Sequence, residues 1–378
     1  MHWPLIWTTG LASHHKSATR QIFKKGGNRH FIHFYIVMTD IETESFLSCL
    51  NRHNRYYYQT VPKNYIAWLN DHDADISNIG GKGASLARLA TSGFPVPPGF
   101  TLTAQAYIEF SEMLELPESL HQVNDLKQGA KMPEIVAALE PVEKKLQTAH
   151  LPDAIDSSLN EAYAKLVSVI GKEASFAVRS SALSEDGSGN SFAGLYESYV
   201  NIKGIEAITK AVLDCYRCLW SPRATHYRSF RNVEHASETM ATVIMQTVDA
   251  KISGVVFSKN PLTGSSEEIV INSSWGFGES IVSGYVTPDM YIVDHRGNLI
   301  SKEINHKTEQ SSLSDEGISR SQTPSDLADL PSLSEKQISE LVQITKEVEQ
   351  LYGQSIDLEF SYDKNETLFL LQARPITA

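Results

Sequence analysis

The stretch "IDLEFSYDKNETLFLLQARP" near the end of the chain most constrains what the sequence can fold into. Ile356, Leu358 and Phe360 alternate with carboxylates, which is typical of a strand with one buried and one polar face. A second apolar run follows a polar break, so we expect an antiparallel hairpin whose turn centres between Asn365 and Glu366. The chain must therefore contain a sheet with one polar face.

That register brings together four side chains of one kind of chemistry. Glu359 would face Gln372, and Asp357 would face Arg374, all on the same face because direct cross-strand partners share a face. A carboxylate beside an amide oxygen offers hard ligands for Mg²⁺, and an arginine can hold a phosphate oxygen. A solvated polar face with one salt bridge is the alternative interpretation.

A second informative stretch, "FAVRSSALSEDGSGNSFAGLYESY", runs from Phe176 to Tyr199. Arg179 ends an apolar strand, where its permanent charge needs an anion or a buried carboxylate nearby. The loop from Ser184 to Gly194 could fold over a phosphate with backbone and hydroxyl donors, but an ordinary surface turn has the same composition. The stretch favours phosphate binding without requiring it.

The segment "NIGGKGASLARLATSG" reads as a glycine loop that opens a short helix closed by Gly93. A helix start rich in glycine presents backbone N–H groups to an anion, and Lys82 adds an ammonium group. The segment lacks the spacing of a P-loop, so it is weak evidence by itself.

Composition excludes several classes of protein. The 378 residues predict two lobes or domains, and the net charge of −12 argues against nucleic acid or an anionic membrane as the main partner. No apolar window is long enough for a membrane span. Three cysteines cannot form a disulfide framework, which favours the cytoplasm, and Cys215 and Cys218 sit at helical spacing as expected for core residues.

Other segments give a coarse plan of the chain. The first 39 residues hold five Lys/Arg and no acidic residue, and we interpret them as an extension before a natural start at Met38. "MATVIMQTV" and "SGVVFSKNP" are expected to be a buried strand pair, and "SSLSDEGISRSQTPSDLADLPS" a polar surface loop. Ser334 and Gln337 form a capping box for a helix closed by Gly353.

Five motifs in order carry a family resemblance: "NIGGKGASLARLATSGFPVPPGF", "FAVRSSALSEDGSGNSFAGLYESYVNI", "SGVVFSKNPLTG", "WGFGESIVSGYVTPDMYIVD" and "LFLLQARPIT". From about Tyr65 onward the chain resembles the N-terminal, nucleotide-binding domain of the phosphoenolpyruvate synthase (pyruvate, water dikinase) and pyruvate phosphate dikinase family. Rifamycin phosphotransferases share this domain. The resemblance implies an α+β, ATP-grasp-like fold of two lobes with ATP and Mg²⁺ bound between them.

The resemblance also implies domain limits and site residues. Residues 63–245 would be the first lobe and residues 246–378 the second. Residues 1–62, which the resemblance does not cover, are expected to be a basic, poorly ordered extension. Phosphate contacts and catalysis would fall to Lys82 and Arg179, and a loop closing over the phosphates would use Gly194 and Ser198. The remaining expected nucleotide contacts are Gln246 for adenine, Glu279 and Arg374, with Glu359 and Gln372 as metal ligands.

Members of this family continue into a domain with a phosphorylatable histidine and a pyruvate- or antibiotic-binding domain. The motif of that histidine is absent here, so a partner protein or domain is expected to supply the histidine and the pyruvate site. The leading hypothesis is the phosphoryl-donating part of a cytoplasmic dikinase. A small-molecule phosphotransferase of the rifamycin type and a non-catalytic nucleotide-binding remnant are the alternatives.

Overall fold

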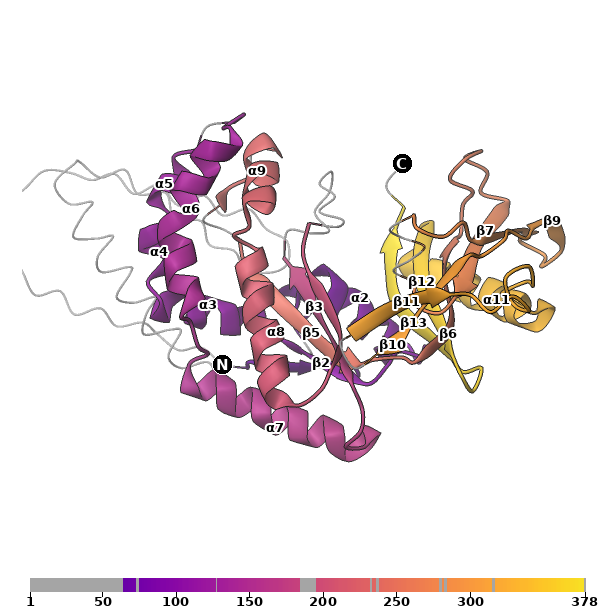
Figure 1. The fold of residues 1–378 in the computed structure, drawn as a ribbon, viewed down its shortest axis with the longest axis horizontal. Coiled ribbons are helices and arrows are strands. Elements are labelled where there is room, and N and C mark those ends of the chain that lie inside the picture. The colour runs from indigo at the N-terminus through magenta and orange to yellow at the C-terminus, as the bar shows by residue number, and fades with distance from the viewer. Residues whose placement is uncertain are drawn as a thin grey trace, which may run out of the picture. The chain divides into compact units, whose positions relative to one another are not determined.

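The computed structural model describes residues 64–72, 75–126, 128–183, 195–231, 233–235, 238–278, 281, 284–314 and 317–376. All of them belong to one compact unit, Lys63–Ala378. The predicted extension of residues 1–62 lies outside the described residues. Two antiparallel sheets and their helices make up this unit (Figure 1), so the α+β class is confirmed.

The first sheet has five strands in the order β1-β2-β5-β3-β4, all paired antiparallel. Its strands are β1 (Ile66–Trp68), β2 (Gly99–Leu102), β3 (Phe176–Ala182), β4 (Ser198–Ile202) and β5 (Met240–Gln246). The helices of this part are α2 (Gly80–Thr91), α3 (Ala104–Met113), α4 (Leu116–Ser119), α5 (His121–Asn124), α6 (Met132–Gln147), α7 (Asp153–Ile170), α8 (Ile205–Cys218) and α9 (Pro222–Arg231), preceded by the 3-10 turn Ile76–Asn78.

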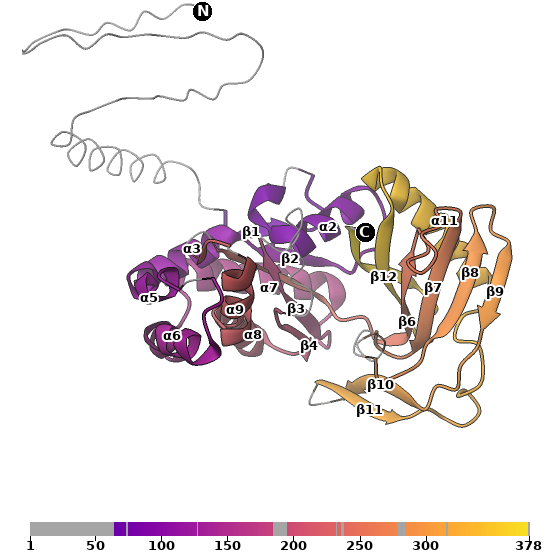
Figure 2. The same ribbon diagram turned by 90° about the horizontal axis from the view of Figure 1, so that it is seen from above.

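The two faces of this sheet pack against different helices. Phe176, Val178 and Ile244 belong to a large core with residues of α3 and α6 to α8. Figures 1 and 2 show these helices beside the strands of this sheet. The other face carries Ala177 and Val243, which pack with residues of α2 in a smaller core. Arg179 follows Ala177 by two positions and therefore belongs to the face that α2 covers.

The second sheet has six strands in the order β13-β12-β6-β7-β8-β9, again with antiparallel pairs throughout. Its strands are β6 (Ala250–Phe257), β7 (Glu268–Trp275), β8 (Asp289–Asp294), β9 (Leu299–Glu303), β12 (Ile356–Asp363) and β13 (Leu368–Pro375). Helix α11 (Glu335–Tyr352) packs its apolar side on one face, in a core that also takes in Leu89 of α2. Helix α2 therefore contributes to the cores of both sheets.

Several local predictions are confirmed. Ser334 and Gln337 form the capping box of α11, and Gly353 closes the helix with a φ of 70°. Cys215 and Cys218 are buried free thiols in the large core. The GGKG segment differs from the expected loop, because Gly80 itself is the first residue of α2.

The expected pairing of "MATVIMQTV" with "SGVVFSKNP" is wrong. Both segments are strands, but β5 pairs with β2 and β3 in the first sheet, and β6 pairs with β7 and β12 in the second. A connection as short as Thr247–Asp249 usually joins hairpin partners, whereas here it carries the chain from one sheet to the other.

The polar stretch predicted to be a loop is in part a hairpin. Strands β10 (Glu309–Ser314) and β11 (Gly317–Gln322) pair with each other in a separate two-stranded sheet. Most of their side chains are at least partly exposed, so the segment lacks the apolar alternation from which a strand is predicted. The Nδ2 atom of Asn201 in β4 donates a hydrogen bond to the Ser314 carbonyl, which links this hairpin to the first sheet.

Within the part of the chain that the structure describes, no helix combines the length and apolar character needed to cross a membrane.

Candidate functional site

Arg179 is the point at which the two sheets meet in the candidate site. From β3 its Nη1 donates to the Leu371 carbonyl at 2.8 Å, and its Nη2 donates to Gln372 Oε1 at 3.1 Å. The same Nη2 lies 3.5 Å from Glu359 Oε2. Only 15% of the arginine side chain is exposed. Of the two partners expected for Arg179 from the sequence, an anion or a carboxylate, the structure shows a carboxylate, Glu359. Its carboxylate partner is itself one of the predicted metal ligands.

The β12–β13 hairpin has the predicted pairs in the part that forms the site. Glu359 faces Gln372, and Asp357 faces Arg374, with Arg374 Nε 2.9 and 2.7 Å from the two carboxylate oxygens. The turn lies half a residue earlier than predicted, because Tyr362 pairs with Leu368.

A register shift after Glu359 compensates for this difference. The partner sequence steps from Gln372 to Leu370, which leaves Leu371 as an extra residue in β13. A bulge of this kind disrupts the ladder locally and is often found beside functional sites. Here the carbonyl of the extra residue, Leu371, accepts the hydrogen bond from Arg179.

The arrangement of Glu359 and Gln372 fits a divalent cation. Their side-chain oxygens converge on one nitrogen, Nη2 of Arg179, at 3.5 and 3.1 Å, so both already face a single positive group. Hard oxygen ligands of this type suit Mg²⁺, which keeps water and substrate phosphate as its other ligands. Among the described residues, no group of three or more His, Cys, Asp or Glu side chains could hold a metal ion.

Helix α2 is fixed to β3 beside Arg179. The Oγ atom of Ser181 accepts from the Gly83 amide at 3.0 Å and donates to the Ile79 carbonyl at 2.8 Å. Gly80 has a φ of +66°, and a Cβ atom there would lie 2.1 Å from the Ser181 carbonyl oxygen. The contact explains why glycine is needed at the start of this helix.

Lys82 lies in the first turn of α2, where the backbone N–H groups have no acceptor within the helix. Burial raises the pKa of the Cys215 thiol well above its usual value, and the Lys82 charge acts in the opposite direction. The ammonium group is therefore within electrostatic range of α8 as well as being part of the helix start. The positive end of the helix dipole and this charge together favour an anion here.

The other predicted contacts do not all lie on the same face of the first sheet as Arg179. Ser198 pairs directly with Arg179 across β3 and β4, so the two share a face. Gln246 pairs with Phe176, which points into the large core, so strand alternation places Gln246 on the face opposite Arg179. Gly194 and Glu279 lie outside the described residues. Their roles, and those of the other predicted contacts, stay predictions.

Gln246 nevertheless borders open space at the connection between the sheets. One hollow of about 340 Å³ is formed with residues of β4 and the β10–β11 hairpin, and another of about 360 Å³ with the turn of the β12–β13 hairpin. Lys364 of that turn forms an ion pair with Asp249 at 2.6 Å, which ties the turn to the connection.

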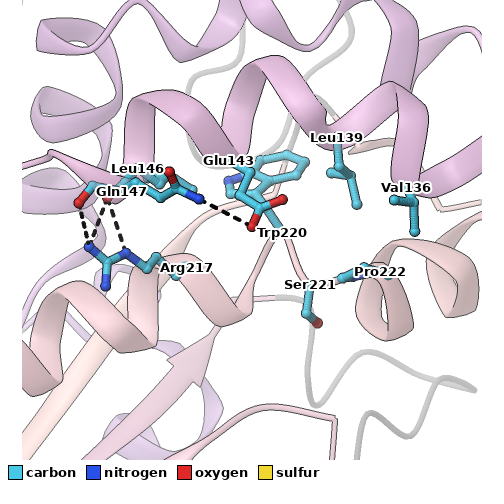
Figure 3. Close-up of a pocket in the computed structure, with 9 residues that line it drawn as sticks. All are labelled: Val136, Leu139, Glu143, Leu146, Gln147, Arg217, Trp220, Ser221 and Pro222. Carbon is cyan, nitrogen blue, oxygen red and sulfur yellow. Dashed lines mark hydrogen bonds between the residues drawn. The ribbon is translucent and has the colours of Figure 1, made fainter.

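A hollow elsewhere contains none of the predicted site residues. It measures about 340 Å³ and lies between α6 and the junction of α8 with α9 (Figure 3). Arg217 lines it and donates to the carbonyls of Leu146 and Gln147. Trp220 at the wall donates its indole N–H to the Tyr107 hydroxyl at 2.7 Å.

Helix α2 also contacts the β12–β13 hairpin, and sequence reasoning missed this contact. Ser85 Oγ accepts from the Ala373 amide at 3.0 Å and donates to the Ala373 carbonyl at 2.5 Å. The Tyr352 hydroxyl of α11 donates to Ser85 Oγ at 3.1 Å, and the Leu370 amide donates to the Pro95 carbonyl at 2.7 Å. Ser85 lies two residues after the GGKG segment, but its partners are too distant in sequence to be predicted.

Comparison with known proteins identifies the family. Residues 76–378 match the family described as the pyruvate phosphate dikinase AMP/ATP-binding domain. A probable phosphoenolpyruvate synthase from Methanocaldococcus jannaschii is 36% identical over 317 residues, which are 83% of this chain and 27% of that protein.

Two other relatives carry different names. The prodigiosin synthesizing transferase PigC of Serratia marcescens is 37% identical over 81% of this chain and 32% of its own length. The uncharacterized phosphotransferase YvkC of Bacillus subtilis is 37% identical over 79% of this chain and 33% of its own length. The chain thus spans about a third or less of each of these three relatives, and within that span it belongs to the AMP/ATP-binding domain family of pyruvate phosphate dikinase.

Proposed function

We propose that the chain is the ATP-binding, phosphoryl-donating part of a phosphoenolpyruvate synthase-like dikinase. It would pass a phosphoryl group from ATP to a histidine on a separate domain or partner protein, and from there to pyruvate. The observation that carries this proposal is the meeting of Arg179 from one sheet with Glu359 and Gln372 from the other.

Phosphoryl transfer needs positioning and neutralisation of charge more than it needs a protein nucleophile. Arg179 and Lys82, with the first turn of α2, would bind the phosphates and stabilise the charge that develops on them. Glu359 and Gln372 would hold Mg²⁺, which would supply positive charge to the phosphates. Ser198, opposite Arg179 in the sheet, would add a hydroxyl donor.

An apolar surface beside Arg179 suits the base and ribose of the nucleotide. Ala177, Met245 and Val200 of the first sheet pack with Leu371 of the second sheet. A purine between the two sheets would contact this cluster, close to the connection Thr247–Asp249. Gln246 remains the predicted polar contact, through its side chain or its backbone carbonyl.

A melting curve with and without ATP·Mg²⁺ tests nucleotide binding. A ligand that binds only the folded chain raises the melting temperature. The rise should be lost in the double variant Glu359→Ala/Gln372→Ala and kept in Arg217→Ala, which removes a charged side chain at the unrelated hollow. No rise in the wild-type chain would contradict the proposal.

Transfer to a carrier histidine needs a second experiment, because ATP binding alone also fits a non-catalytic remnant. The chain would be mixed with γ- and β-labelled ATP and with a histidine-bearing domain of a related phosphoenolpyruvate synthase. Acid-labile label on that domain supports the dikinase proposal. Stabilisation by ATP without any labelling would favour the remnant.

A small-molecule phosphotransferase is the second candidate. The observation that favours it is the 37% identity to PigC and to YvkC, whose names describe a transferase and a phosphotransferase. Label transfer to a small acceptor, in the absence of any histidine-bearing domain, would distinguish this function from the dikinase function.

A further inference from the structure

The predicted phosphate-binding arginine and the predicted metal ligands bind each other. Nη2 of Arg179 is 3.1 Å from Gln372 Oε1 and 3.5 Å from Glu359 Oε2. The other terminal nitrogen, Nη1, donates to the Leu371 carbonyl at 2.8 Å. The guanidinium group therefore stands where the two oxygens converge.

This geometry makes the arginine and a divalent cation competitors. A guanidinium group and Mg²⁺ are both cationic, so they cannot share the same two oxygens at contact distance without strong repulsion. The arginine side chain is 15% exposed and Glu359 33% exposed, so water screens this repulsion only in part. A phosphate without metal also binds at a cost. It must replace Glu359 as the partner of Arg179, and the negative charge of Glu359 repels the phosphate.

We infer that Arg179 occupies the divalent-cation position in the ligand-free site and is displaced only when metal and phosphate arrive together. The inference rests on the proposed function, since it assigns Glu359 and Gln372 to the metal. The metal takes the two oxygens, and the phosphate takes the released guanidinium group. Each ligand thereby removes the cost that the other would meet alone.

The consequence is a reciprocal coupling between the two ligands. Metal must raise the affinity for nucleotide by the same factor by which nucleotide raises the affinity for metal. Part of this coupling comes from the direct contact of metal with phosphate, and the arginine adds to it. The chain would therefore discriminate against free metal and against free nucleotide.

The first experiment measures Mn²⁺ binding without nucleotide, by titration calorimetry on the full chain. Arg179→Ala removes the competitor and should bind Mn²⁺ about tenfold more tightly than the wild type, or tighter still. Arg217→Ala is the control, because it removes the same charge at a hollow that contains none of the predicted site residues. The control should change the affinity much less. Equal Mn²⁺ affinity in the wild type and in Arg179→Ala would overturn the inference.

The second experiment measures ATP binding in excess chelator and covers the case in which Arg179→Ala does not fold. Glu359→Gln keeps the shape of the side chain while it removes the repelling carboxylate, so metal-free ATP should bind several-fold more tightly than to the wild type. Asp357→Asn, on the same face of β12, is the control for loss of one negative charge. Unchanged or weaker binding of metal-free ATP to Glu359→Gln would contradict the inference.

The two experiments separate this inference from the proposed function. If wild-type chain binds ATP·Mg²⁺ but Arg179→Ala gains no Mn²⁺ affinity, the function stands and the competition is wrong. If Arg179→Ala gains Mn²⁺ affinity but no variant binds ATP under any condition, the competition is real and the nucleotide site is wrong.

Discussion

Arg179 and Gln372 lie 193 positions apart in the chain, and their side chains are joined by a hydrogen bond of 3.1 Å. Arg179 comes from the sheet of β1 to β5, and Gln372 from the sheet that ends in β13. The contact fixes the two sheets to each other at the candidate site. It also gives Arg179 a measurable role in both binding and stability.

Replacing Arg179 or Lys82 with Ala should weaken the binding of ATP·Mg²⁺ by about tenfold or more, since each removes a charge-assisted contact to phosphate. The fold should survive, because Glu359 stays one-third exposed and can be solvated when its partner is removed. Calorimetry gives the affinity, and a melting curve gives the stability. Unfolding of Arg179→Ala with unchanged nucleotide affinity would show that the arginine is only a structural ion-pair partner.

Gly80→Ala should destabilise the chain strongly. The residue has a φ of +66°, and its new Cβ would lie 2.1 Å from the Ser181 carbonyl, so α2 would have to shift away from β3. Gly93→Ala is a matched control, with a φ of +86° but no atom within 4 Å of the added Cβ. Unfolding in urea should show the larger loss for Gly80→Ala by more than about 1 kcal/mol. Equal losses would mean that backbone conformation alone accounts for the glycine.

Ser85→Ala should lower both stability and nucleotide affinity. It removes the oxygen that joins α2, the Ala373 backbone and Tyr352, so a partly buried junction loses hydrogen bonds worth about 1 kcal/mol each. Ser158→Ala is the control, because that hydroxyl bonds an exposed carbonyl in α7. If Ser85→Ala lowers stability but leaves the affinity for ATP·Mg²⁺ unchanged, the junction stabilises the fold without positioning the site.

The stability of the chain should fall as the pH drops from about 6.5 towards 4. Burial, helped by the nearby Arg228 charge, lowers the pKa of His235 to about 4. Its Nδ1 accepts from the buried Arg228 Nε at 3.2 Å. The unfolded chain takes up the proton at the higher pH, so the contribution of neutral His235 is complete above 6.5 and is lost progressively below it. The melting temperature should fall less steeply with decreasing pH for His235→Gln than for the wild type. Equal dependence on pH in the two proteins would exclude His235 as the cause.

The local sequence pattern predicted those contacts of the site that join residues close together in the sequence. The pairs of Glu359 with Gln372 and of Asp357 with Arg374 follow from strand alternation and a short turn, and the structure confirms both. The capping box at Ser334 follows from helix chemistry in the same way. In each case the interacting residues lie in one hairpin or one helical turn.

Predictions that needed the path of the chain between sheets were less successful. Nothing in the alternation of β5 and β6 shows that the three residues between them cross from one sheet to another. The bonds of Ser85 to Ala373 and of Ser181 to Gly83 join positions far apart in sequence, where a serine has no distinguishing pattern. The β10–β11 hairpin escaped prediction because exposed strands carry no apolar period.

The extra residue in β13 gives the hairpin an unusual tolerance to shortening. Deleting Leu371 would leave Glu359 opposite Gln372 and Phe360 opposite Leu370, because the pairing already steps over that position. The sheet could close its ladder without this residue, but Arg179 would lose its carbonyl acceptor. The extra residue therefore serves the contact with Arg179 and is not required by the ladder of the sheet.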